Sequence, residues 1–284
     1  MNEDNETGLI KDIFTNNEKC LTDEEKQRLH EQDKRLVSDF KAKELELQAQ
    51  RNWDLFYKRN ETRFFKDRRW TTREFTELLC DTDSGTTTNS KKRYMLEVGC
   101  GVGNLIYPLI EDKTLANKFF YYACDFSPRA IEFVRTNSLY DENCMKAFQC
   151  DITTEELLDT IPKSSLDIIT MVFVLSAINP KKFPIVVKNL RELLKPNGIV
   201  LFRDYGRYDM AQLRFKPGHK IAENLYMRQD GTRSYYFSES ELSELFESNQ
   251  FETISNCYVH RRTLNYKEGI DVPRIFLQSK FRKT

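Results

Sequence analysis

The sequence predicts a doubly wound α/β fold, in which a mostly parallel sheet carries helices on both faces. Short apolar runs alternate with helical patterns, as parallel strands joined by crossover helices require. These runs are Tyr94–Val98, Phe119–Cys124, Met145–Cys150, Leu166–Leu175 and Ile199–Arg203. Two later runs, Phe251–His260 and Arg274–Phe281, have no helix between them, so we expect them to pair antiparallel at one end of the sheet. The prediction is a sheet of seven strands.

The composition is that of a soluble globular protein with one main domain. The chain has 284 residues, and 44 basic side chains balance 44 acidic ones, so any nucleic-acid surface must be local. The seven cysteines form no C-x-x-C pair, and the N-terminus has no apolar signal segment. We therefore expect no metal ion, no membrane span and a cytoplasmic location, with the nucleus as a second one.

The chain divides into segments by composition. Thr22 followed by Glu25 is a capping-box pattern, which predicts that a helix begins there. The stretch before it is polar and aperiodic, and DTDSGTTTNS is too rich in turn formers for regular structure. The expected segments are a flexible lead over residues 1–21, a helical region over 22–80, a linker over 81–90 and the catalytic domain over 91–284.

A glycine-rich turn follows the first predicted strand of the sheet. Glu97-Val-Gly-Cys-Gly-Val-Gly103 opens a helix, and glycines such as Gly99 and Gly101 let the backbone turn tightly and approach a ligand closely. Such a turn also suits NAD or FAD, or only joins a strand to a helix. By itself it predicts a nucleotide-type site without naming the ligand.

Three acidic residues favour one ligand over the others. Asp125 ends the second strand, where a carboxylate can accept hydrogen bonds from both ribose hydroxyls. Asp151 ends the third strand, and Glu97 is placed to meet an ammonium group. This acidic rim suits a cationic sulfonium better than a pyrophosphate, so we predict S-adenosylmethionine as the cofactor of a methyltransferase. The alternative for Asp125 and Asp151 is helix capping.

The methyl acceptor is narrowed by absent motifs. The end of the fourth strand, read as Phe173–Pro180, has no cysteine for covalent addition to a pyrimidine ring carbon. It also lacks the N/D-P-P-Y/F motif of enzymes that methylate exocyclic amines, and the chain lacks a cysteine triad for radical chemistry. A ring nitrogen, a protein or a small molecule remains.

Positive charge is concentrated in two segments. Lys58–Arg73 has seven basic residues against two acidic ones, interleaved with Phe64, Phe65 and Trp70, and Arg261–Lys283 has another seven against two. Cations suit phosphates and flat rings suit unstacked bases, so the pattern predicts an RNA-binding surface. The alternative for the first segment is a solvated helix face with buried aromatic residues.

A long insertion follows the fifth predicted strand. Residues 203–237 exceed a simple connection and are rich in polar and aromatic side chains, so we interpret them as a substrate lid. Asp204 leads this insertion from the carboxyl end of a strand, where site residues gather. We assign Asp204 the catalytic role, with a loop cap as the alternative.

The chain resembles the methyltransferase-like family that forms 3-methylcytidine in the anticodon loop of tRNA, in particular its serine-tRNA branch. The resemblance runs from about residue 22 to 281. It is carried by Val37–Phe40, Asn52–Arg59, Phe64–Arg68, Trp70–Phe75, Leu96–Asn104, Ala123–Ala130, Phe202–Gly206, Arg228–Arg233 and Pro273-Arg274.

The resemblance implies roles for individual residues. It implies that the helical region folds over the cofactor and that the cofactor contacts are Trp53, Tyr57, Gly99, Asp125, Asp151, Ile152 and Val172. It implies that the flipped cytosine, at position 32 of serine tRNA, is surrounded by Phe64, Phe65, Arg68, Asp204 and Arg274. We also assign Tyr205, Arg228 and Arg233 to the RNA, and expect a monomer that seryl-tRNA synthetase assists.

Two other functions stay open from the residues alone. A methyltransferase of a small molecule or protein would make the two basic segments incidental. A non-catalytic adaptor would keep the fold and bind a partner, although the intact glycine turn and its three acids argue against this interpretation.

Overall fold

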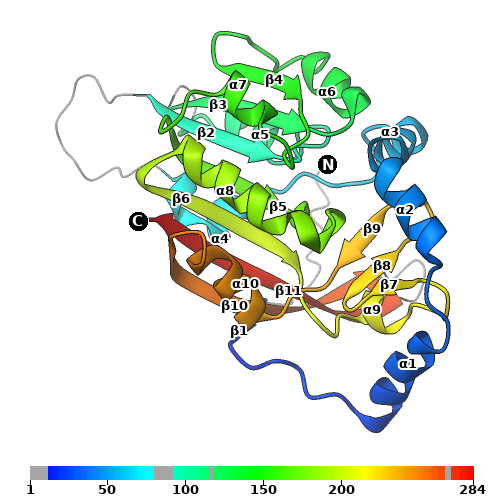
Figure 1. Cartoon of the computed structure of the whole chain (residues 1–284). Coiled ribbons are helices and arrows are strands. Elements are labelled where there is room, and N and C mark those ends of the chain that lie inside the picture. The colour runs from blue at the N-terminus through cyan, green and yellow to red at the C-terminus, as the bar shows by residue number, and fades with distance from the viewer. Residues whose placement is uncertain (1–11, 80–91, 116–117, 266–269) are drawn as a thin grey trace, which may run out of the picture.

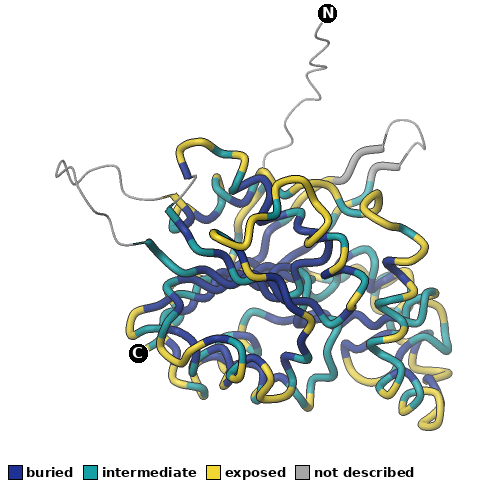
Figure 2. Tube along the Cα trace, turned by 90° about the horizontal axis from the view of Figure 1, so that it is seen from above, coloured by how far each residue is buried: buried dark blue, intermediate teal, exposed yellow. Residues whose placement is uncertain are grey.

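The structure is a computed structural model that describes residues 12–79, 92–115, 118–265 and 270–284 (Figure 1). The linker predicted over residues 81–90 lies outside these ranges. One large sheet, in the order β1-β10-β11-β6-β5-β2-β3-β4, forms the centre of the molecule. Figure 2 shows that its strands are the buried core, with exposed residues on the surrounding loops and helices. No helix among the described residues is long and apolar enough to cross a membrane.

The strands reproduce the predicted alternation. The central parallel strands are β2 (Arg93–Val98), β3 (Phe119–Asp125), β4 (Met145–Gln149), β5 (Leu166–Val172) and β6 (Leu194–Tyr205). The predicted antiparallel pair is β10 (Phe251–Asn265) with β11 (Ile270–Lys283), and β11 joins β6 antiparallel. The doubly wound prediction is confirmed.

An eighth strand comes from the segment that we expected to be a flexible lead. Strand β1 (Ile13–Thr15) pairs antiparallel with Tyr258–His260 of β10, so the prediction is wrong for these residues. Its apolar side chains Ile13 and Phe14 are 65% and 46% exposed, so backbone pairing and a neighbouring ion pair hold the strand rather than burial. Asp12 meets the buried guanidinium of Arg203 at 3.1 Å, and this partner lies 191 residues away in the chain.

The fourth strand ends earlier than predicted. It stops at Val172 rather than Leu175, because Phe173 takes a left-handed conformation with φ of 60°. A 3₁₀ turn, η2 (Leu175–Ala177), follows directly. This sharp exit turns Ser176 towards the carboxyl end of β6.

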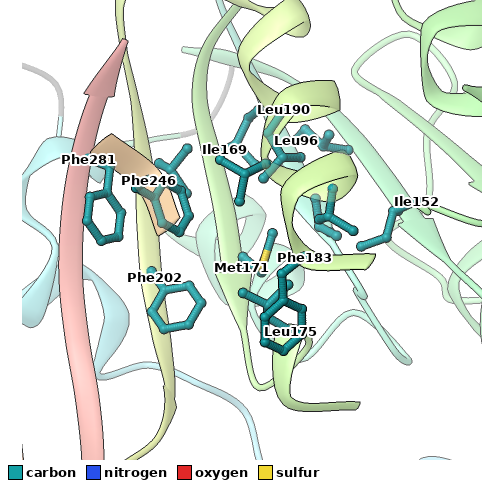
Figure 3. Close-up of a cluster of buried hydrophobic side chains, with 14 of the residues drawn as sticks. Leu96, Ile152, Ile169, Met171, Leu175, Phe183, Leu190, Phe202, Phe246 and Phe281 are labelled. Atoms are coloured by element: carbon teal, nitrogen blue, oxygen red, sulfur yellow. The ribbon is translucent and has the colours of Figure 1, made fainter. Parts of the chain in front are cut away.

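Helices cover both faces of the sheet. One face packs against α7 (Glu156–Thr160), α8 (Phe183–Leu193) and α10 (Glu239–Glu247). Figure 3 shows side chains of this cluster. In it the rings of Phe246 and Phe281 are stacked, with their centres 3.8 Å apart. The other face packs against α5 (Ile106–Glu111), α6 (Pro128–Arg135) and the turn η1 (Thr76–Leu78), which follows α4 (Thr71–Glu74). Apolar burial on both faces is what a parallel sheet needs for stability.

The N-terminal helical region begins with the helices α1 (Asp23–Asp33), α2 (Asp39–Leu47) and α3 (Ala49–Asn60). Helix α1 begins with the predicted capping box, in which Thr22 accepts from the backbone N–H of Glu25 and Glu25 accepts from that of Thr22. Neither helix α1 nor α2 has a wide buried face. They are held by tertiary contacts with the insertion.

The insertion has a small sheet of its own. It contains α9 (Met210–Leu213) and three antiparallel strands, β7 (Lys220–Ala222), β8 (Leu225–Met227) and β9 (Arg233–Tyr235). Gln32 of α1 donates to the carbonyl of Gln212 at 2.9 Å and accepts from the hydroxyl of Tyr226 at 2.9 Å. The N-terminal helices and the insertion therefore pack against each other beside the carboxyl ends of the central strands (Figure 1).

Candidate functional site

The glycine turn after β2 depends on two positive backbone angles. Gly99 has φ of 60° and Gly101 has φ of 56°, a region that residues with a Cβ atom enter at a cost. A Cβ atom on Gly101 would lie 2.9 Å from the hydroxyl of Tyr57, which comes from α3. The absence of a side chain at Gly101 therefore lets α3 approach the turn.

A cavity of about 360 Å³ lies at this turn, below α3 and at the carboxyl ends of the parallel strands. This is within the usual range for a small-molecule site. The predicted cofactor residues in its wall are Trp53, Tyr57, Gly99, Gly101, Asp125, Asp151, Ile152 and Val172. They come from α3 and from the ends of four strands, which meet at one edge because the strands are parallel.

Two carboxylates of the cavity wall, Asp125 and Asp151, also accept hydrogen bonds from the turns next to them. Asp125 accepts the backbone N–H groups of Gly101 and Ser127, both at 2.9 Å. The side-chain cap of α6 is Ser127, not Asp125. Asp151 accepts the N–H and hydroxyl of Thr153 at 2.9 and 2.8 Å. A carboxylate has about four acceptor positions, so each keeps capacity for a ligand.

Glu97 lies beneath the turn and is not part of the cavity wall. Its side chain is 2% exposed, and its Oε2 atom has no hydrogen-bond partner among the described residues. Burial raises the pKa of Glu97 to about 8, although the nearby Arg68 guanidinium acts in the opposite direction. At neutral pH the carboxyl group is therefore largely protonated.

Replacing Glu97 with glutamine is expected to flatten the pH dependence of stability. The folded pKa, about 8, lies above the ordinary value of 4.5, so the stability contribution of this group is complete below pH 4.5 and is lost as pH rises through 8. Each pH unit in that window removes at most about 1.4 kcal/mol. Glu97→Gln should match the wild type near pH 4.5 and exceed it at pH 8, in denaturant unfolding. A variant that loses stability as steeply as the wild type would assign the dependence to another group.

The aromatic-basic segment Lys58–Arg73 runs past the cavity. Phe65 lines the wall, whereas Phe64 is 57% exposed, and both rings pack on Phe56 with centroids 5.8 and 4.9 Å away. The segment from residue 61 to 70 is not helical. The alternative of a solvated helix face with buried aromatic residues does not describe Phe64.

Arg68 joins this segment to the end of β5. Its guanidinium donates to the carbonyl of Val172 at 2.9 Å and lies 5.6 Å from the ring centre of Phe173. Its backbone N–H donates to the carbonyl of Asn104 at 2.7 Å. Arg68 and Phe173 both line the cavity, so the predicted acceptor side adjoins the cofactor side.

Asp204 lies at the carboxyl end of β6 as predicted, one residue before Tyr205, but its carboxylate is fully buried and does not line the cavity. One oxygen accepts the backbone N–H of Ser176 at 2.9 Å, and the other accepts that of Tyr205 at 2.9 Å. Burial raises the pKa of Asp204 to about 6. Asp204 thus holds the turn η2 through Ser176, and Ala177, the residue after Ser176, is in the cavity wall. Asp204 therefore stands directly behind that wall.

Three more predicted RNA residues form a cluster beside the cavity rather than in its wall. The guanidinium groups of Arg228 and Arg274 lie 5.2 and 5.9 Å from the ring centre of Tyr205. Tyr205 in turn packs 5.1 Å from Phe173, which is in the wall. Arg274 also pairs with the buried Asp209 at 2.9 Å. The cluster places two cations and a ring next to the acceptor side.

Arg233 does line the cavity, together with Glu46, Asn104 and Lys182, to which the sequence patterns assign no role. Its guanidinium pairs with Glu46 of α2, which also pairs with Lys182. Asn104 is a further wall residue, and its amide donates to the carbonyl of Phe65 at 3.3 Å. Asn104 directly follows the glycine motif, which is a usable signal, whereas Glu46 has no local signal.

The residues present fit S-adenosylmethionine. Gly99 and Gly101 leave space that a Cβ atom would fill, and Ile152, Trp53 and Val172 offer apolar surface for a flat base. Asp125 has acceptor capacity for a ribose diol.

Comparisons with known proteins agree with this geometry. Residues 57–256 match a family described as a methyltransferase domain. The chain is 54% identical over 265 residues to the human tRNA N(3)-cytidine methyltransferase METTL6, covering 93% of this chain and 90% of the human one. It is 41% identical over 236 residues to the tRNA N(3)-methylcytidine methyltransferase trm140 of Schizosaccharomyces pombe, covering 82% of this chain and 74% of that protein.

A solved structure supports the fold. The S-adenosylmethionine-dependent methyltransferase from Anabaena variabilis superposes with a TM-score of 0.55 at 14% identity, covering 83% of this chain and 95% of that one. At this identity the likeness concerns the fold alone. The predicted class I, Rossmann-like architecture is confirmed.

Proposed function

We propose that this chain methylates N3 of a cytidine in tRNA. The chain belongs to the family of tRNA N(3)-cytidine methyltransferases. The observation that carries this proposal is 54% identity across 93% of the chain, together with a cavity that has a glycine turn and strand-end acids. The methyl donor is S-adenosylmethionine. It supplies an electrophilic methyl group on a sulfonium sulfur.

The protein's part in the reaction is mainly alignment. Cytosine N3 has an in-plane lone pair, so the ring needs proximity and orientation more than a strong base. A base in a tRNA loop must leave its stack to reach the cavity, and the exposed ring of Phe64 beside Phe65 offers a stacking surface at its edge. Arg68 closes the acceptor side between these rings and Phe173.

Asp204 has an electrostatic part in this proposal. The methylated ring becomes a cation, and a carboxylate in a dry environment stabilises positive charge that grows nearby. Burial raises the pKa of Asp204 to about 6, so it is mostly ionised at neutral pH. Its hydrogen bond to the N–H of Ser176 also fixes the turn that contributes Ala177 to the wall.

The finer substrate that we propose is cytidine 32 in the anticodon loop of serine tRNA. The support is the resemblance of Arg228–Arg233 and the other motifs to the serine-tRNA branch. The cations Arg228 and Arg274 lie beside the acceptor side, where a polyanion would be attracted. We further propose seryl-tRNA synthetase as a partner in tRNA recognition, a monomeric enzyme, and action in the cytoplasm and nucleus.

The substrate is tested with total tRNA and a labelled methyl donor. The labelled nucleotide is mapped after incubation, and the proposal expects the label in serine tRNA at position 32. Binding should also weaken steeply as salt rises, because phosphate contacts release counterions. Label confined to other tRNAs would contradict the serine assignment but leave the family activity intact. Label in protein or small molecules alone would contradict both.

Replacing Phe64 with alanine is expected to weaken RNA binding about tenfold and to leave cofactor binding within about twofold. A stacked base contributes roughly 1–3 kcal/mol, and the ring of Phe64 is 57% exposed while Phe65 already lines the cavity. Dissociation constants for tRNA and for S-adenosylhomocysteine measure the two effects separately. Phe40→Ala is the matched control, since this ring on α2 is 80% exposed. Equal loss of both ligands in Phe64→Ala would show that the ring is structural.

A further inference from the structure

An ion cluster of three side chains lies in the wall of the cofactor cavity. Glu46, near the end of α2, pairs with Lys182 at 2.8 Å through one carboxylate oxygen and with Arg233 through the other. The amide of Asn179 lies 3.4 Å from the second oxygen. Glu46, Lys182 and Arg233 all line the cavity. One carboxylate thus joins three segments of the chain that are distant in sequence.

The three segments belong to different parts of the fold. Helix α2 is in the N-terminal region, Arg233 begins β9 of the insertion, and Lys182 ends the turn η3 (Pro180–Lys182) that leads into α8. Figure 1 shows α2 and α3 beside the strands of the insertion. Arg233 is only 6% exposed, so its charge depends on Glu46 for neutralisation in a poorly hydrated position.

Weaker ties hold the next helix over the same cavity. Asn52 of α3 donates to the carbonyl of Gly231 at 2.9 Å, and Gln50 donates to the carbonyl of Phe126 at 3.2 Å. Asp54 accepts the hydroxyl of Ser127 at 2.9 Å. These contacts follow the rim of the cavity whose wall includes Trp53 and Tyr57. Helices α2 and α3 therefore form a cover over the cavity, which is bonded to the insertion and to the segment after β3.

We propose that Glu46 is a positioning residue that clasps this cover closed, so that the ion cluster of Glu46, Lys182 and Arg233 sets how long the cofactor stays bound. The inference rests on the proposed function only in taking this cavity as the S-adenosylmethionine site. Trp53 and Tyr57 of α3 line the cavity, so we take movement of α3 as the route of ligand release, which the clasp opposes. Opening also frees Lys182 and Arg233 of the cavity wall from Glu46, so an RNA phosphate can compete for them.

The clasp is charged at every practical pH. Burial opposes ionisation, but the hydrogen bonds from Lys182 and Arg233 lower the pKa of Glu46 to about 2. Acidification to pH 5 therefore leaves it closed. Salt has a modest effect on it, because Arg233 is shielded from solvent.

The test is the dissociation rate of S-adenosylhomocysteine from the full chain, followed by stopped-flow tryptophan fluorescence, to which Trp53 in the cavity wall contributes together with Trp70. Glu46→Gln keeps the shape and removes the charge. We expect the rate to rise about tenfold, which corresponds to about 1.4 kcal/mol of lost closed-state stability. Amide hydrogen exchange over residues 39–47 should become faster in the ligand-free variant. Lys182→Gln should raise the rate less, and the double variant should not exceed Glu46→Gln.

Glu44→Gln is the matched control. Glu44 lies on the same helix and pairs at 2.8 Å with Lys41 of α2 itself. Removing the charge of Glu44 therefore breaks no ion pair between α2 and another segment. A Glu46→Gln rate within about twofold of the wild type, or an equal change in Glu44→Gln, overturns the clasp. Neither result depends on tRNA, so failure of the clasp and failure of the proposed substrate are separable.

Discussion

Asp204→Asn is expected to lower the turnover number at least about a hundredfold, with cofactor affinity changed by no more than about twofold. Removing one electrostatic stabiliser of a transition state costs on this order. The change retains the size of a side chain that is fully buried and hydrogen-bonded to the N–H groups of Ser176 and Tyr205. Single-turnover methylation of tRNA at saturating cofactor measures it.

The pH profile gives a second signature of Asp204. Its pKa is raised by burial to about 6, from an ordinary value of 3.8. The ionised form is the active one in this proposal, so turnover should rise with pH through about 6 and level off above it. Asp204→Asn should lose that rise.

Asp209→Asn provides a comparison with a buried carboxylate that holds the proposed RNA residue Arg274. Asp209 is also fully buried in the insertion, where it accepts the N–H groups of Ile275 and Ala211 and pairs with Arg274. If Asp204→Asn lowered only the melting temperature, with normal turnover per folded molecule, the electrostatic assignment would be wrong. The loop-cap alternative would then describe Asp204.

Gly99→Ala is expected to weaken cofactor binding about a hundredfold. The left-handed backbone at φ of 60° costs a residue with a Cβ atom about 1–2 kcal/mol. The new atom would also lie 2.4 Å from Cγ2 of Val174, so the turn or the wall of the cavity must shift. Calorimetric titration with S-adenosylhomocysteine measures the affinity.

A second substitution separates the two causes. Val174→Ala removes the contacted methyl groups, so Gly99→Ala with Val174→Ala should regain the steric part and retain the backbone cost. If Gly99→Ala bound the ligand within about threefold of the wild type, the turn would not be a cradle for it. Val174→Ala alone is the control for changes in the wall.

Much of the fold follows from local patterns in the sequence. Buried parallel strands are continuous apolar runs, and the capping box at Thr22 marks a helix start by itself. Strand β1 was missed because its pairing with Tyr258–His260 joins residues far apart in the chain. The small sheet of the insertion was missed because three-residue strands leave no periodic pattern.

The residues of the site also divide into those that a local pattern predicts and those that depend on contacts between distant segments. Strand-end residues such as Asp125 and Asp151 reach the cavity because parallel strands present their carboxyl ends at one edge. The local sequence does not show how deeply a strand-end side chain is buried. Glu97 and Asp204 are both buried, and neither lines the cavity. The pairing of Glu46 with Arg233 depends on how α2 docks on the insertion, which no spacing in the sequence reveals.

The most direct test of the central claim is nucleoside analysis of one defined serine tRNA after reaction with the protein and S-adenosylmethionine. Mass spectrometry against authentic standards distinguishes methylation at N3 of cytidine from methylation at C5 or the exocyclic amine. The account predicts 3-methylcytidine, lost when cytidine 32 is replaced by uridine. A methyl group on another atom, or an unchanged yield after that replacement, would contradict it.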